Sequence, residues 1–89
     1  MSIQVQVGEL ADAMAVYRFA YLVTISDDGR AHVVAVTPRW DGRALIVEGL
    51  GRRSAANLAA RPAVTLVWPP LEPQGYSLIL DGEVSGDAA

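Results

Sequence analysis

Residues 20–42 read AYLVTISDDGRAHVVAVTPRWDG, and this stretch decides the fold class. It contains two runs rich in β-forming residues, Ala20–Ser26 and Ala31–Trp40, with Asp27-Asp28-Gly29 between them. Aspartate followed by glycine favours a tight turn, so the two runs are predicted to pair as an antiparallel hairpin. Pro38 lacks a backbone N–H, and it marks where the second run loosens or becomes an edge.

The segments on either side extend this hairpin into a sheet with two helices. Upstream, apolar residues between Glu9 and Arg18 recur at helical spacing. Downstream, Gly51-Arg52-Arg53-Ser54 leads into Ala55–Ala60, a good helix-forming run that Pro62 ends. Further strands are predicted at Ala44–Glu48, Ala63–Trp68 and Tyr76–Val84, with an extended arm at 3–7 and a last turn at 85–87.

The pattern of apolar residues predicts how these strands are arranged. Continuous apolar runs at 21–25 and 78–80 favour strands that are covered on both faces. Two consecutive hairpins, a crossing helix and two more strands therefore predict a closed or nearly closed barrel. The expected fold class is mainly β (α+β), with antiparallel strands, an N-terminal helix and one short crossing helix. Residues 1–89 are expected to form a single domain.

Composition excludes several classes of function. The chain has no cysteine, which excludes disulfides and thiolate chemistry, and its single histidine excludes a multi-histidine metal site. The net charge of −3 argues against nucleic-acid binding, and so against a small nucleic-acid-binding barrel as the alternative fold. No apolar run reaches the ~18 residues that cross a bilayer. The start of the chain lacks the charged and apolar regions of a signal peptide, so a cytoplasmic location is expected.

The segment Gly49-Leu50-Gly51-Arg52-Arg53-Ser54 is the one most able to carry chemistry. It follows a predicted strand and opens a helix, whose first N–H groups have no partner within the helix. Glycines allow close backbone approach, the two arginines add forked donors, and Ser54 can cap the helix or donate its hydroxyl. This combination suits a phosphate. The alternative is that Ser54 is only an N-cap, with Arg52 and Arg53 solvated.

Several segments also follow one another in a recognisable order and spacing. They are Ala20–Ser26, Asp28-Gly29-Arg30, His32–Val36, Trp40-Asp41-Gly42, Gly51–Leu58, Arg61-Pro62 and Val64–Val67. This order resembles the pyridoxamine-5′-phosphate-oxidase-like family of FMN-binding split barrels, over most of the chain from Ala20 to Val84. The resemblance implies a six-stranded split barrel that forms a homodimer. It also implies FMN, or the deazaflavin F420 in a sister branch, bound in a groove between the subunits.

The resemblance further implies a returning strand after residues 85–87, where only Ala88-Ala89 remain. Either this last strand is missing, or a partner subunit covers the open edge of the sheet, because an exposed edge strand invites pairing.

Carried over position by position, the resemblance implies where the cofactor binds. Residues of the second strand would lie beside the ring and the ribityl chain. The end of the third strand and the helix start that follows would hold the phosphate. The implied cofactor-binding residues are His32, Val34, Ala35, Val36, Thr37, Val47, Glu48, Arg52, Arg53 and Ser54. Backbone N–H groups of Val34 to Val36 are expected to tune the redox chemistry of the ring, and no side chain need act as a covalent catalyst.

The chain departs from the oxidases proper at several of these positions. Those enzymes carry basic residues at the places of His32 and Thr37, and a threonine at the place of Glu48. A carboxylate here would repel a phosphate unless Arg52 or Arg53 neutralises it. Oxidation of pyridoxamine phosphate itself is therefore not expected.

Three functions stay open at this point. The first is a flavin- or deazaflavin-dependent oxidoreductase of unknown substrate, the second a cofactor-binding module without turnover, and the third a cofactor-free dimeric interaction module. The other conspicuous residues have structural interpretations. His32 is expected to be an ordinary surface or interface histidine, and Trp40 and Trp68 packing residues. On the crossing helix, Asn57 is expected to face outward and Leu58 the core.

Overall fold

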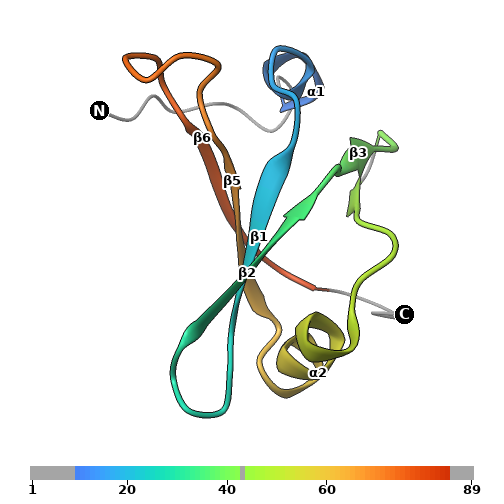
Figure 1. The fold of residues 1–89 in the computed structure, drawn as a ribbon. Coiled ribbons are helices and arrows are strands. Elements are labelled where there is room, and N and C mark those ends of the chain that lie inside the picture. Colours follow the sequence, from blue (N-terminus) through green and yellow to red (C-terminus); the bar gives the residue numbers. More distant parts are fainter. Residues whose placement is uncertain (1–9, 43, 85–89) are drawn as a thin grey trace.

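A computed structural model describes residues 10–42 and 44–84 of the chain. Its elements, in chain order, are α1 (Leu10–Ala15), β1 (Ala20–Ile25), β2 (Ala31–Val36), β3 (Arg39–Trp40), β4 (Leu45–Ile46), α2 (Arg52–Ala60), β5 (Ala63–Trp68) and β6 (Leu78–Glu83). Four strands form one antiparallel sheet in the order β2-β1-β5-β6, and β3 and β4 pair separately (Figure 1). The predicted mainly antiparallel α+β fold is confirmed.

The β1–β2 hairpin forms where it was predicted. Its turn is closed by a hydrogen bond from the Ser26 N–H to the Arg30 carbonyl, at 2.9 Å. Gly29 has φ of 82°, a left-handed conformation that glycine adopts without strain. The register runs from Ile25 opposite Ala31 to Ala20 opposite Val36.

The second predicted strand, Ala31–Trp40, is divided into two. The ladder with β1 ends at Val36, and after Thr37 and the buried Pro38 the chain enters the short strand β3. β3 pairs with β4 across the predicted turn at Asp41-Gly42, so the predicted strand Ala44–Glu48 is reduced to Leu45–Ile46. Proline interrupts the ladder because it cannot donate to it, which is the physical reason for the division.

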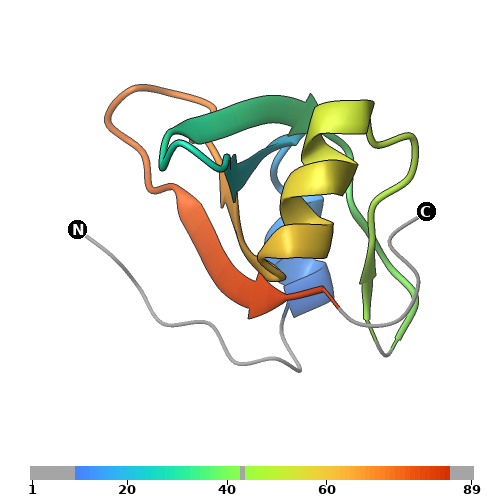
Figure 2. The same ribbon diagram turned by 90° about the horizontal axis from the view of Figure 1, so that it is seen from below.

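The core lies on one face of the four-stranded sheet. Burial alternates along β1, so that Ala20, Leu22 and Thr24 point inward while Tyr21 and Ile25 are exposed. The inward residues of β1 and β5 pack with Leu10 of α1. Figures 1 and 2 show both helices and the β3–β4 hairpin on this side of the sheet.

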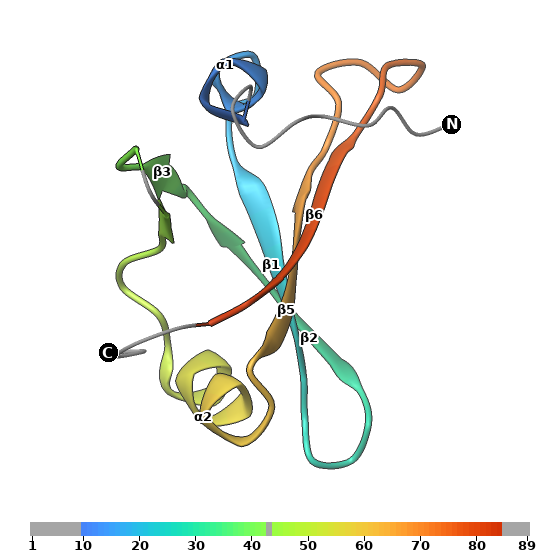
Figure 3. The same cartoon turned by 180° about the vertical axis from the view of Figure 1, so that it is seen from behind.

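The predicted closed or nearly closed barrel is split-barrel-like in the described part of the chain, where the sheet stays open and does not close into a barrel. Exposed apolar side chains lie on its outer face, at Tyr21, Ile25, Val33 and Ile79. Figure 3 shows no helix on that side of β5 and β6. The apolar runs were interpreted as covered on both faces, but no described element covers the outer one.

The helix ends also differ from the expectations. α1 spans only Leu10–Ala15 of the predicted 9–18, whereas α2 begins at Arg52, three residues before the predicted run. The predicted arm at 3–7 and the turn at 85–87 lie outside the described residues.

Candidate functional site

The candidate site is a groove of about 340 Å³ at the end of β2. One wall is formed by the last residues of β2 and the segment after it, and the other by β4 and the segment after that. Its lining residues are Ala35, Val36, Thr37, Arg39, Ile46, Glu48 and Gly49. The segments on either side of the β3–β4 hairpin therefore meet at one concave surface.

The short β3–β4 ladder decides which side chains enter this groove. Trp40 and Leu45 lie opposite each other in the ladder and pack against the core cluster. Because side chains alternate along a strand, the neighbouring pair Arg39 and Ile46 faces away from the core, and both line the groove. The expected packing role of Trp40 is confirmed, and it is this packing that turns Arg39 outward.

An ion pair lies between two residues of the groove wall. The Arg39 Nη2 donates to the Glu48 Oε1 at 2.8 Å. Glu48 follows the ladder partner of Arg39 by two positions, a diagonal relationship that long side chains can bridge. Both side chains are largely exposed, at 60% for Arg39 and 72% for Glu48, so the pair contributes little to folding stability.

The backbone of β2 also borders the groove. The hydrogen-bonded pair Ser26 and Arg30 closes the turn, and antiparallel pairing then alternates by two residues. It follows that the N–H and C=O groups of Val34 and Val36 point to β1, while those of Ala35 point to the other edge. No described strand pairs with that edge. The backbone N–H groups of Val34, Ala35 and Val36 were expected to bind the ligand. Only the N–H of Ala35 points away from β1, toward the open edge where a ligand could reach it.

The start of α2 lies outside the groove lining. Arg52 and Arg53 are exposed, and within residues 10–42 and 44–84 their side chains make no hydrogen bond or ion pair. The N-cap is Gly51, without a side-chain hydrogen bond, so the alternative in which Ser54 is the N-cap is wrong. Ser54 sits in the first helical turn, buried at 1% exposure, and its hydroxyl has no partner among the described residues.

The structure thus divides the predicted cofactor-binding residues into two groups. Those that line the groove are Ala35, Val36, Thr37 and Glu48, and those that do not are His32, Val34, Val47, Arg52, Arg53 and Ser54. The neutralising partner of Glu48 is Arg39, rather than Arg52 or Arg53. Sequence reasoning missed Arg39, although the Asp41-Gly42 turn signal places it across a hairpin from the segment that contains Glu48.

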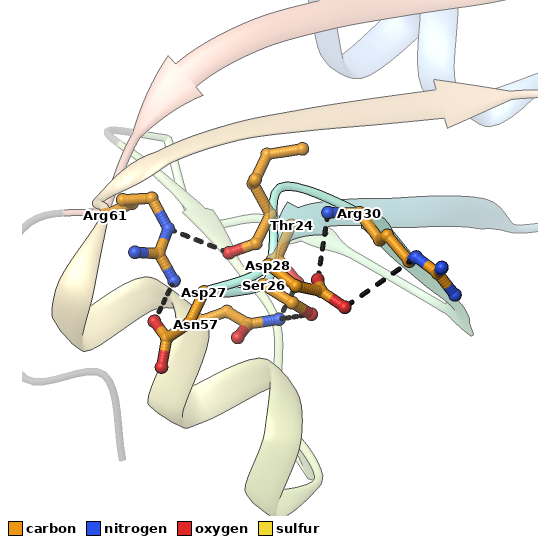
Figure 4. Close-up of polar contacts among 8 residues, drawn as sticks. Thr24, Ser26, Asp27, Asp28, Arg30, Asn57 and Arg61 are labelled. Carbon is orange, nitrogen blue, oxygen red and sulfur yellow. Dashed lines mark hydrogen bonds and ion pairs between the residues drawn. The ribbon is translucent and has the colours of Figure 1, made fainter.

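A polar cluster holds α2 against β1, toward the hairpin-turn end of the sheet (Figure 4). Asn57 Nδ2 donates to Thr24 Oγ1 at 3.0 Å and to Ser26 Oγ at 3.3 Å. Thr24 is 1% exposed and Asn57 6%, so the outward position predicted for Asn57 is wrong. Leu58 is buried, as predicted, and Trp68, at 2% exposure, is confirmed as a packing residue.

The C-terminal end of α2 is tied to the β1–β2 hairpin as well. Arg61 Nε donates to the Ile25 carbonyl at 2.9 Å, and its Nη2 to Asp27 Oδ1 at 2.8 Å. Figure 4 shows both contacts beside the Asn57 cluster. Contacts from Asn57 within α2 and from Arg61 at its C-terminal end therefore fix the orientation of the helix.

Two further features concern the part of the chain that the structure describes. It contains no group of three or more histidine, aspartate or glutamate side chains able to hold a metal ion. None of its helices has both the length and the apolar character that crossing a membrane requires.

Comparison with known proteins finds two mycobacterial relatives whose names do not state a function. The chain is 46% identical, over 95 aligned positions, to the uncharacterized protein Mb0449c of Mycobacterium bovis, covering 97% of this chain and 67% of that protein. The same values hold for the uncharacterized protein MT0457 of Mycobacterium tuberculosis. No family model matches the chain.

A solved structure similar to this chain supports the fold. It is the crystal structure of the conserved hypothetical protein Rv2991 from Mycobacterium tuberculosis, with a TM-score of 0.71 and 23% sequence identity. The match covers 91% of this chain and 52% of that one, so the chain spans about half the length of this neighbour.

Proposed function

We propose that this chain, which belongs to the family of the mycobacterial proteins Mb0449c and MT0457, binds FMN or the deazaflavin F420 and acts as an oxidoreductase. The observation that carries the proposal is the groove at the end of β2. Two separate segments implied to contact the cofactor, 35–37 and the one that contains Glu48, line this single concavity.

The residues of the groove suit such a cofactor in three respects. Its volume of about 340 Å³ is at the lower end of the range for small-molecule sites, ~300–1,000 Å³. Ala35 offers an N–H and a C=O at an unpaired strand edge, which can bind the polar rim of a planar ring. Arg39 offers a guanidinium to an anionic group. When bound, a flavin or deazaflavin supplies hydride transfer, and the chain supplies position and electrostatics.

We further propose a homodimer formed through the outer face of the sheet, with the groove beside the subunit boundary. Support comes from the apolar side chains exposed there, Tyr21, Ile25, Val33 and Ile79. Strand spacing and rise give this face an area of about 400 Å². A standard interface needs about 800 Å² from each partner. The contact would therefore extend past the sheet edges, and Ala35 lies at one of them.

Ligand titration with a variant that blocks the groove tests the proposed function. FMN and F420 are added to the intact protein, and binding is followed by flavin or deazaflavin fluorescence. Ala35→Trp adds bulk at an exposed β2 position that lines the groove, so affinity should fall at least tenfold. Ala31→Trp is the matched control, because Ala31 is an exposed alanine on the same face of the same strand, four residues from Ala35. Its affinity should match the wild type. Binding of neither cofactor by the wild-type protein would overturn the proposal.

The exposed sheet face also favours one alternative, a dimeric interaction module that needs no cofactor. The titration separates the two functions, because such a module would dimerise without binding FMN or F420. A cofactor-binding protein without turnover would bind FMN or F420 in the titration yet show no substrate-dependent bleaching.

A further inference from the structure

We propose that Arg39 is the anion-binding side chain of the groove and that Glu48 restrains it by competing with the anion of the ligand. This inference rests on the proposed cofactor binding and specifies its chemistry: the groove selects a ligand that carries a phosphomonoester over the same ligand without it. The juxtaposition that carries the inference is the Arg39–Glu48 ion pair across the wall of the groove.

Arg39 is the sole cationic residue of the groove lining within the described chain. The backbone of Arg39 is constrained, because it pairs with Ile46 in the β3–β4 ladder and follows the buried Pro38. The position from which its side chain extends is therefore well defined. The side chain itself remains 60% exposed. A guanidinium has five N–H donors, and the contact with Glu48 engages one of its terminal nitrogens. The other donors are available to a second acceptor.

Glu48 restrains this cation for an electrostatic reason. Its carboxylate lies 2.8 Å from the guanidinium and lines the same groove, so it would lie beside any anion that Arg39 receives. A phosphomonoester carries close to two negative charges at neutral pH, whereas the carboxylate carries one. The phosphate is therefore the stronger partner for Arg39. Phosphate binding requires the Arg39–Glu48 ion pair to separate, or Glu48 to remain beside a like charge. Either requirement weakens the affinity for the phosphate.

The experiment compares FMN with riboflavin, which has the same ring and ribityl chain but no phosphate. Both ligands are titrated into wild-type protein, Glu48→Gln and Arg39→Gln at low ionic strength, with fluorescence as the readout. Glu48→Gln should tighten FMN binding about two- to fivefold, because exposed charge pairs contribute on that scale. Arg39→Gln should weaken FMN binding about fivefold. Riboflavin affinity should change less than twofold in either variant.

Matched controls remove the effect of overall charge. Arg30→Gln and Glu83→Gln make the same charge changes at exposed positions outside the groove lining, and should leave FMN affinity within twofold of the wild type. If wild-type protein binds FMN but Glu48→Gln and Arg39→Gln leave its affinity unchanged, the inference fails while the proposed function stands. Equal changes for FMN and riboflavin would also overturn it. If no protein in the series binds FMN or riboflavin, the inference fails, and the proposed function then depends on F420 binding in the titration described above.

Discussion

At the scale of single residues, the amide of Asn57 is the polar group on which the placement of α2 depends most. It is buried between the helix and β1, and its two donated hydrogen bonds reach Thr24 and Ser26. A buried polar group is tolerated when its hydrogen bonds are made, and it is costly when they are not. The cluster therefore specifies how the helix docks, because a rotation of α2 would leave these groups unpaired.

Replacing Asn57 with alanine should lower the free energy of unfolding by about 2 kcal/mol, because Thr24 Oγ1 would lose its buried donor. Urea unfolding followed by circular dichroism measures this loss. The double variant Thr24→Val/Asn57→Ala should lose less than the sum of the two single changes, because it removes both partners together. An Asn57→Ala protein as stable as the wild type would contradict this account of the cluster.

Arg39 shows what sequence reasoning could and could not reach at the residue scale. The turn signal at Asp41-Gly42 was recognised, and alternation about Trp40 would have placed Arg39 opposite the segment of Glu48. The ion pair itself depends on the strand break after Val36, because only then does β3 leave the main sheet. The position of Asn57 was mispredicted for a related reason. Its burial is tolerated only because Thr24 happens to lie opposite it, a tertiary fact with no local signal.

At the scale of elements, local signals were most informative where turn chemistry and β-propensity agree. The strand Ala63–Trp68 has the bounds that its β-forming residues and the flanking prolines predict. The β1–β2 hairpin likewise follows its Asp-Gly turn. The extent of pairing beyond Pro38 was less predictable, because proline signals a weakened ladder without saying which strand the chain pairs with next. Continuous apolar runs could not show whether the second face is covered by this chain or by another.

The contact between α2 and the β1–β2 hairpin leads to a prediction at this scale. Arg61→Gln should lower the free energy of unfolding by about 1 kcal/mol, because Arg61 donates to both the Ile25 carbonyl and Asp27. Asp27→Asn removes only the exposed ion pair, whose aspartate side chain is 94% exposed, and should have little measurable effect. Thermal unfolding of the two variants checks this order. Equal losses would show that the ion pair, rather than the backbone contact, connects the two elements.

At the scale of the whole molecule, the uncovered outer face of the open sheet is the feature that sequence patterns did not predict. Its inner face carries the core, with both helices and the β3–β4 hairpin against it. Its outer face carries exposed apolar side chains beside the exposed carboxylates of Asp81 and Glu83 and, within the described residues, is uncovered. We propose that the apolar side chains on this face form an interaction site, because exposed apolar patches of this size are often functional. The proposed homodimer gives this face a partner and brings the groove near the boundary between two copies.

A single charge on the outer face should separate the proposed dimer. Ile79→Arg places a guanidinium at a 58%-exposed position on β6, and burying it without a partner would cost more than the contact provides. Sedimentation velocity should show a shift from dimer to folded monomer. Leu71→Arg is the control, because Leu71 is equally exposed, at 61%, but lies in the loop before β6. A wild-type protein that is already monomeric at high concentration would contradict the proposed dimer.

The most direct test of the central claim is the site of flavin binding, mapped by amide chemical shifts in solution as FMN is added to the intact protein. We expect saturable shifts at the groove residues Ala35, Thr37, Arg39 and Gly49. The hairpin turn at 27–30, at the far end of β2, should stay unchanged. Shifts confined to other surfaces, or no shifts at saturation with either FMN or F420, would contradict the account.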